Sequence, residues 1–193
     1  LMSHKYYHTK ESVDSYIKMA EGYNGQALIE RLKKHLKNGC SILELGSGPG
    51  NDIELLGQDF KVTGSDYSEL FLERLNKCHT DISFLNLDAI SLSTTLSFDG
   101  IYSNKVLQHL TDKELKTSIE NQYRIVNDDG VICHSFWNGE GCDTIGGIIH
   151  NYHTRDDLVE LFSPKFTILH LEEYKEMDEG DSLFIIAQKV INS

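Results

Sequence analysis

The most informative residues of this chain are three glycines spaced two apart, at Gly46, Gly48 and Gly50. They directly follow the largely apolar segment Ile42–Leu45, so a buried strand is expected to end in a turn of bare backbone. Such a turn lets a ligand touch the main chain, because glycine has no side chain to keep it away. About twenty residues later, the short strand Lys61–Ser65 ends at the carboxylate of Asp66, which suits the hydroxyls of a ribose. These features predict an adenosine-type ligand at the carboxyl ends of parallel strands.

The same loop discriminates between classes of adenosine-type ligand. A dinucleotide-binding loop of the pattern GxGxxG needs its third glycine at position 51, where this chain has Asn51. Glu44 stands before the loop, where its carboxylate would repel a pyrophosphate and attract an amino group or a sulfonium. The pattern therefore favours a neutral or cationic ligand, and a nicotinamide-dependent oxidoreductase remains a rival interpretation.

Strands and helices alternate along most of the chain. We expect strands at Ile42–Leu45, Lys61–Ser65, Ser83–Leu87, Phe98–Ser103, Val131–Phe136, Phe166–Tyr174 and Ser182–Val190. We expect helices over Glu11–Leu36, over Asp52–Leu56, from the cap Ser68 to Asn76, from Asp112 to Val126 and from Thr154 to Phe162. Only the short turn Met177–Asp181 separates the last two strands, so they must pair antiparallel. This order predicts the α/β class, with a doubly wound, mainly parallel, seven-stranded sheet and a C-terminal antiparallel hairpin.

Two of the expected helices begin with a recognisable cap. Thr111 precedes the helix that starts at Asp112, and Glu114 at its third position completes a capping box. Thr154, with Asp157 three residues later, opens the last helix in a similar way. These caps place the start of each helix more firmly than periodicity alone.

Four motifs, in order, resemble those of the class I S-adenosylmethionine-dependent methyltransferases. They are Glu44–Gly50, Gly64–Asp66, Asn86–Ala89 and Phe98–Asn104, within the segment Ser41–Phe136. The reversed final strand is also a mark of that family against ordinary Rossmann dehydrogenases, so the resemblance implies its Rossmann-like methyltransferase fold. The opening tyrosines and the segments Ser135–Gly139 and Asn151–Tyr152 are similar to small bacterial members near the tellurite-resistance type.

The resemblance implies a role for each motif residue. Gly46, Ser47, Gly48 and Gly50 would form the loop at the methionine portion of S-adenosylmethionine, with Glu44 at its amino end. Asp66 would accept hydrogen bonds from both ribose hydroxyls, Tyr67 would lie against the adenine, and Asp88 and Ala89 would contact the adenine amine. Ser103 and Asn104 would face the methyl group. Each residue also has a purely structural interpretation: Asp66 and Asp88 as helix caps or solvated strand ends, and Tyr67 as a packing residue.

Methyl transfer from a sulfonium is an in-line displacement that depends on geometry more than on covalent help. A general base matters only when the acceptor arrives protonated. His109 and Tyr152 are the candidate catalytic side chains, although His109 is as easily a packed wall residue and Tyr152 a core residue beside Trp137. His150 and His153 flank a predicted loop, where solvated histidines are the default.

The N-terminal part of the chain is the expected cover of the site. We expect residues 1–193 to form one methyltransferase domain in which 1–37 is a helical lid or cap region. Tyr6, Tyr7 and Tyr16 would close over the ligand and exclude water, or would simply dock a helix. Length and periodicity do not separate these two alternatives.

Composition limits the partners. The 193 residues include 18 basic and 30 acidic side chains, a net charge of −12, which disfavours a nucleic-acid substrate. No apolar run approaches the ~20 residues that cross a bilayer, and we expect a cytoplasmic protein that is a monomer or homodimer. The four cysteines form no CxxC pair, and the histidines form no tight metal-ligand pattern, so no metal is predicted.

The sequence thus predicts S-adenosylmethionine-dependent methyl transfer to a small-molecule acceptor. The alternative from another class is a non-catalytic module that binds S-adenosylmethionine or S-adenosylhomocysteine as a sensor or partner subunit. Labelled-cofactor incubation separates the two, because a sensor transfers no label.

Overall fold

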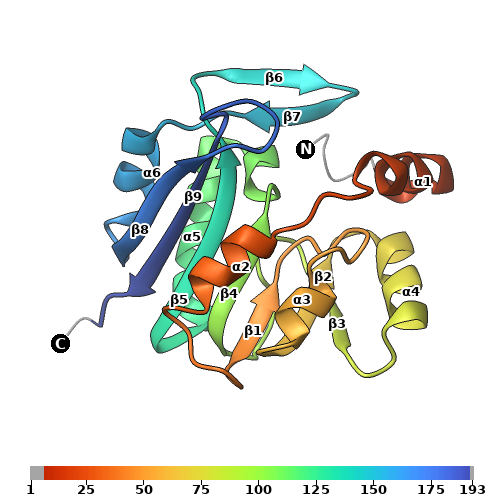
Figure 1. The fold of residues 1–193 in the computed structure, drawn as a ribbon, viewed down its shortest axis with the longest axis horizontal. Helices are drawn as coiled ribbons and strands as arrows, with labels where there is room; N and C mark the ends of the chain where they lie inside the picture. Colours follow the sequence, from red (N-terminus) through yellow and green to blue (C-terminus); the bar gives the residue numbers. More distant parts are fainter. Residues whose placement is uncertain (1–6, 192–193) are drawn as a thin grey trace.

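The computed structural model describes residues 7–191, and its centre is a seven-stranded sheet (Figure 1). In chain order the strands are β1 (Ser41–Glu44), β2 (Lys61–Asp66), β3 (Ser83–Asn86), β4 (Phe98–Asn104), β5 (Val126–Trp137), β8 (Phe166–Tyr174) and β9 (Ser182–Lys189). Their order across the sheet is β3-β2-β1-β4-β5-β9-β8. The first five strands pair in parallel, whereas β9 is antiparallel to both β5 and β8. The predicted fold, with its reversed terminal hairpin, is confirmed.

The strand order places the carboxyl ends of β1 and β4 at the centre of one sheet edge. From β1 the chain builds outward through β2 and β3 on one side, and then returns to β4 and β5 on the other. Open α/β sheets bind their ligands at such a reversal, because neighbouring connections leave the sheet on opposite faces and open a crevice. The glycine loop follows β1 at this point, and Asp66 ends β2 beside it.

Helices cover both faces of the sheet. They are α1 (Lys10–Met19), α2 (Gln26–Leu32), α3 (Ile53–Gly57), α4 (Glu69–Cys78), α5 (Asp112–Ile125) and α6 (Arg155–Phe162), with a short 3₁₀ helix η2 (Leu107–His109). Alternate strand residues point to opposite faces. Leu43 and Ile101 therefore pack in the core under α5 and α6, while Ile42 and Tyr102 pack in the core under α2.

The predicted helix over Glu11–Leu36 is in fact two helices, α1 and α2, joined by a turn. Gly22 takes a positive φ of 85°, and Gly25 caps α2. A Cβ atom on Gly25 would overlap the hydroxyl of Tyr102, so the chain needs bare backbone here. The apolar spacing predicted helical character correctly, but the two glycines interrupt it and let α2 alone reach the sheet.

A second hairpin was not predicted. Residues expected to form a glycine-rich loop pair as β6 (Cys142–Ile145) and β7 (Ile148–Asn151), the projecting ribbon in Figure 1. Gly146 and Gly147 connect them with φ values of 60° and 86°. A Gly-Gly pair between two isoleucines is a hairpin signal of the kind that needs positive φ at both turn positions, so the sequence did contain a signal for this hairpin.

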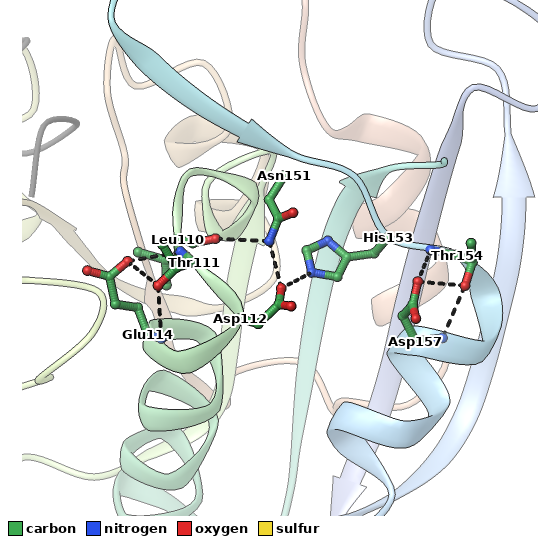
Figure 2. Close-up of polar contacts among 8 residues, drawn as sticks. All are labelled: Leu110, Thr111, Asp112, Glu114, Asn151, His153, Thr154 and Asp157. Carbon is green, nitrogen blue, oxygen red and sulfur yellow. Dashed lines mark hydrogen bonds and ion pairs between the residues drawn. The ribbon is translucent and has the colours of Figure 1, made fainter. Parts of the chain in front are cut away.

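The two predicted helix caps are present (Figure 2). The side chain of Thr111 accepts from the backbone of Glu114, whose carboxylate accepts in return from the backbone of Thr111. Thr154 and Asp157 make the same reciprocal pair at the start of α6. Only Leu110 separates η2 from Thr111, so the first cap lies close to the cleft.

Candidate functional site

A cleft with about 850 Å³ of space, partly open to solvent, lies at the carboxyl ends of β1, β2 and β4. Its floor includes Gly46, Gly48 and Asp66, one wall includes Tyr67, Leu87 and Ala89, and the opposite wall includes Lys105, Val106, His109, Leu110 and Ile148. Tyr7, His8 and Tyr16 border it from the N-terminal segment. The glycine loop and the β2 carboxylate thus meet, as predicted, in one cavity.

Each glycine of the loop has a positive φ, but different side chains lie beside each one. The φ values are 62° at Gly46, 49° at Gly48 and 87° at Gly50. A Cβ on Gly46 would come within 2.7 Å of two methyl groups of Val106, and one on Gly50 within 2.6 Å of Leu75. Gly46 and Gly48 line the cleft, whereas Gly50 packs against α4 behind it. The third glycine of the pattern therefore holds the loop rather than facing the cavity.

Gly46→Ala should destabilise the protein more than Gly22→Ala. Both substitutions force a side chain into positive φ, which costs about 1 kcal/mol, but only Gly46 has Val106 beside it, since Gly22 has no atom within 4 Å of a built Cβ. Overpacking adds about 1–3 kcal/mol. Urea denaturation measures the difference, and Val106→Ala in the Gly46→Ala background should recover part of it. Equal losses in both variants would show that Val106 yields without cost.

Asp66 connects the glycine loop to the end of β2. Its Oδ2 accepts from the backbone N–H of Gly48 at 2.9 Å, and its Oδ1 accepts from the backbone N–H of Ser68 at 2.8 Å. Burial raises the pKa of Asp66, and these backbone hydrogen bonds oppose the rise. A carboxylate has about four acceptor positions, and the backbone N–H of Tyr67 also donates to it, so Asp66 keeps some acceptor capacity for the cleft.

Glu44 ends β1 directly before the loop, and it is not among the residues that line the cleft. It is 4% exposed, and its Oε2 has no hydrogen-bond partner. Burial is the main cause that raises the pKa of Glu44 to about 8, and the negative charge of Asp52 adds to it. The side chain of Ser47, also buried, opposes the rise by a hydrogen bond. A buried carboxyl group with an unpaired oxygen suits a cationic partner, which none of its neighbours provides.

Tyr67 and Ala89 line the cleft together with Asp66, and their contact with an adenine stays a prediction. Tyr67 is 44% exposed, so one side of its ring faces solvent. Asp88 does not line the cleft, and its Oδ1 accepts from the backbone N–H of Ile90 at 2.8 Å. Its observed role is therefore to close a local turn, which differs both from the adenine contact and from the helix cap or solvated strand end given as alternatives.

The structure does not bring Ser103 and Asn104 to the cleft. Ser103 is fully buried on the α5 face and hydrogen-bonds Nδ1 of His134 at 2.8 Å. Asn104 donates to Asp52 at 3.2 Å and accepts from the Ser135 hydroxyl at 2.7 Å, in the core on the other face. Strand alternation explains both placements, because residues inside β4 must point into one of the two cores.

Lys105, which sequence reasoning missed, takes the place at the end of β4. Its φ is 56°, and its backbone N–H donates to the Ser135 hydroxyl at 2.9 Å. Its Nζ donates to the Phe136 carbonyl at 3.0 Å and to the Ser182 hydroxyl at 2.7 Å, and lies 3.5 Å from the centre of the Trp137 ring. Burial lowers the pKa of Lys105 to about 7. No sequence signal marks a lysine with positive φ, since lysine rarely adopts it.

His109 on η2 lines the cleft and has a defined tautomer. Its Nδ1 is 2.8 Å from the carbonyl oxygen of Ile149 on β7. A carbonyl only accepts, so Nδ1 carries the proton and Nε2 is left as an acceptor. Burial is the main cause that lowers the pKa of His109 to about 4. The ring of His150 packs edge-on at 4.8 Å between centroids.

Tyr152 and His153 lie outside the cleft. The Tyr152 hydroxyl donates to Asp143 at 3.3 Å, across the base of the β6–β7 hairpin. His153 is buried, with Nε2 at 3.8 Å from the carboxylate of Asp112, which also accepts from Asn151 at 2.8 Å (Figure 2). These contacts attach the hairpin to the start of α5, where Ile148 lines the cleft and the carbonyl of Ile149 contacts His109.

The N-terminal aromatic residues cover the glycine loop. The Tyr7 and Tyr16 rings are 5.1 Å apart between centroids, and both pack on Phe71 of α4. The Tyr7 carbonyl accepts from the Ser68 hydroxyl at 2.6 Å. Tyr6, the remaining tyrosine of the expected lid, lies outside the described residues.

Two kinds of feature are absent from residues 7–191. These residues include no group of three or more His, Cys, Asp or Glu side chains placed to hold a metal ion. Within the same range, no helix combines the length and apolarity needed to cross a membrane.

Comparison with known proteins gives a consistent result. Residues 42–130 match the family model described as a methyltransferase domain. An uncharacterized methyltransferase of Oceanobacillus iheyensis is 31% identical over 93 residues, which are 47% of this chain and 44% of that protein. The chain therefore matches less than half the length of this curated relative.

Solved structures share the fold. A 1,6-didemethyltoxoflavin-N1-methyltransferase of Burkholderia thailandensis, with bound 1,6-didemethyltoxoflavin and S-adenosylhomocysteine, has a TM-score of 0.77 at 20% identity, covering 94% of this chain and 86% of that one. TehB from Haemophilus influenzae has a TM-score of 0.70 at 18% identity, covering 92% of this chain and 67% of that one. At these identities the likeness shows the fold alone, and a finer placement near the tellurite-resistance type stays a prediction. Residues 42–130 are thus similar to the methyltransferase-domain family, and the chain shares the fold of solved S-adenosylmethionine-dependent methyltransferases.

Proposed function

We propose that this protein is an enzyme that uses S-adenosylmethionine to methylate a small-molecule acceptor. The observation that carries the proposal is the meeting of Gly46, Gly48 and Asp66 in one cleft at the strand-order reversal, where Asp66 holds the glycine loop through the Gly48 N–H. A nucleoside that carries methionine needs bare backbone, a ribose acceptor and a site for an ammonium group. All three are provided by neighbouring residues.

The residues present fit S-adenosylmethionine at four points. Asp66 keeps acceptor positions for ribose hydroxyls, and Tyr67 and Ala89 border an apolar wall with Leu87 that suits an adenine. Gly46 and Gly48 offer main chain to the methionine portion. Directly before the loop, the unpaired Oε2 of Glu44 suits its ammonium. Asn51 stands where a dinucleotide-binding GxGxxG loop has its third glycine, which weighs against a nicotinamide oxidoreductase.

When bound, the sulfonium supplies a methyl group that is already activated for in-line displacement. The chain has to hold the acceptor in line and exclude water, and such positioning can contribute ~7–11 kcal/mol. Tyr7 and Tyr16 close one side of the cleft, and Val106, Leu110 and Ile148 form an apolar wall on the other. His109 presents Nε2 as an acceptor, which can orient an N–H or O–H group of the acceptor molecule or take its proton.

Several features support a small acceptor. The net charge of −12 repels nucleic acid, and Lys105 is the one lysine or arginine among the described residues that line the cleft. The Burkholderia neighbour was crystallised with a small heteroaromatic molecule. We further propose that the chain acts as a single cytoplasmic domain, monomeric or homodimeric, with residues 1–37 as its lid.

Two measurements test the proposal. Titration calorimetry should detect binding of S-adenosylhomocysteine and S-adenosylmethionine but no comparable binding of NAD. Incubation with S-adenosylmethionine labelled in the methyl group and a fractionated metabolite extract should then transfer label to a small molecule. Binding without transfer to any fraction would favour the sensor or partner-subunit alternative, and preference for NAD would favour the oxidoreductase.

His109→Gln should separate turnover from cofactor binding. With an acceptor from the label screen, we expect turnover to fall by about 10²–10⁴-fold, while the affinity for S-adenosylhomocysteine changes little, since glutamine retains a polar side chain on η2. Because burial lowers the pKa of His109 to about 4, the wild-type rate should show no histidine inflection between pH 5 and 8. Unchanged turnover in the variant would make His109 a wall residue only.

A further inference from the structure

Two buried carboxyl groups flank the glycine loop in the chain. Glu44 is 4% exposed and Asp52, which precedes α3, is 5% exposed. Neither takes part in the ion pairs formed among the described residues. Two buried acids that act on each other are not both ionised without a large cost, so one of them is expected to keep its proton.

The hydrogen bonds identify Asp52 as the charged member. Its Oδ1 accepts from the Gly25 N–H at 2.5 Å, and its Oδ2 accepts from the Tyr102 hydroxyl at 2.8 Å and from Nδ2 of Asn104 at 3.2 Å. The Asn104 amide is oriented this way because its oxygen accepts from the Ser135 hydroxyl at 2.7 Å. All three partners donate, and a carboxylate accepts from all of them without a proton of its own.

Glu44, in contrast to Asp52, has surroundings that do not favour a negative charge. Its Oε2 has no hydrogen-bond partner. The titratable groups that face it are Asp52 at the start of α3, Asp66 at the end of β2 and Tyr102 on β4, and all are acids. None of them stabilises a second negative charge. Glu44 is therefore the member that holds a proton at neutral pH in the free protein, in agreement with its raised pKa of about 8.

We propose that Asp52 is a positioning residue that keeps Glu44 protonated until a ligand's ammonium group reaches Glu44, so that binding of an amino-acid-bearing nucleoside releases one proton. The inference rests on the proposed function, because the ammonium is that of S-adenosylmethionine or S-adenosylhomocysteine. The proton leaves the Glu44 carboxyl group for solvent, and the resulting carboxylate pairs with the ammonium.

Calorimetry with S-adenosylhomocysteine tests this directly. Titrations at pH 6.5 in buffers of different ionisation enthalpy should give a release of close to one proton per ligand, falling toward zero above pH 8. Correspondingly, the affinity should rise up to about tenfold per pH unit between pH 6 and 8. Methylthioadenosine, which has no amino group, should bind without this proton release and without this pH dependence.

Two variants assign the effect to the pair. Glu44→Gln should abolish the proton release and make the weakened affinity independent of pH. Asp52→Asn should move the pH at which the affinity levels off downward by about one unit or more, since the neighbouring charge is gone. Circular dichroism checks that both fold, and if Asp52→Asn does not, the Glu44→Gln comparison still decides the question.

A failure of this inference can be distinguished from a failure of the proposed function. Binding of S-adenosylhomocysteine with no proton release and a flat pH profile would overturn this inference and leave the proposed function intact. No binding of S-adenosylhomocysteine at any pH would overturn the proposed function itself. A proton release that persists unchanged in Glu44→Gln would assign it to another group and also reject the inference.

Discussion

Replacing Asp66 with alanine should weaken binding of S-adenosylmethionine and S-adenosylhomocysteine by about 10²–10⁴-fold. Two ribose hydroxyls would lose a charged acceptor, at about 1.5–3 kcal/mol each, and each 1.4 kcal/mol is about tenfold in affinity. The loop also loses its anchor, because Asp66 accepts from the Gly48 N–H. Titration calorimetry measures the affinity, and Asp81→Ala, at an exposed position, is the matched control that should bind normally.

A double comparison separates the ribose contact from the loop anchor. The wild-type protein should bind an S-adenosylhomocysteine analogue without the 2′- and 3′-hydroxyls much more weakly than the parent compound. In Asp66→Ala the two compounds should bind nearly equally, since the acceptor of those hydroxyls is gone. If the variant still discriminates fully between them, the ribose lies elsewhere and Asp66 serves only the loop.

Glu44→Gln should change how the stability of the free protein depends on pH. The folded protein holds the Glu44 proton up to a pKa of about 8, whereas the unfolded chain releases it near pH 4.3. Between these values the folded state binds more protons, so the contribution of Glu44 to stability falls as pH rises, and it levels off above pH 8. The slope is at most about 1.4 kcal/mol per pH unit. The neutral amide of the Glu44→Gln variant does not titrate, so this pH-dependent contribution to stability is absent.

Urea denaturation at several pH values measures the effect as the difference between the two proteins. Wild type minus Glu44→Gln should become steadily less favourable from pH 5 to pH 8, while the groups that both proteins share cancel. Glu73→Gln, at an exposed position on α4, should give a flat difference. A flat difference for Glu44→Gln would mean that the Glu44 carboxyl group ionises inside the folded protein as easily as in water.

The helix caps and the strands of the sheet could be predicted from local sequence signals. Thr111 and Thr154 were expected to start α5 and α6, and they do, because a cap satisfies backbone groups within one turn of chain. The reversed hairpin of β8 and β9 followed from the short turn between them. The turns at Gly22 and at Gly146 and Gly147 also depend on local signals. They were not predicted, because the first lies within a segment of helical spacing and the other two within a glycine-rich segment.

Only some of the residues at the cleft could be predicted from the sequence. Gly46, Gly48, Asp66, Tyr67 and Ala89 were placed correctly beside one cavity, because they end or follow adjacent parallel strands. Tyr152 was expected in the site, but its hydroxyl turns to Asp143 on the hairpin. His109 acquires its tautomer from a carbonyl of that same unpredicted hairpin, about forty residues later in the chain.

The sequence by itself determined the order of strands and helices, the glycine loop and the carboxylate that ends β2, because each depends on residues within a few positions of one another. Only the tertiary structure decided that Ser103 and Asn104 turn into the two cores, that Lys105 takes their place at the cleft, and that Asp52 lies beside Glu44. Which face a strand end presents, and which charges come close to one another, depend on how distant segments pack. Burial changes the protonation of an acid only once that packing exists.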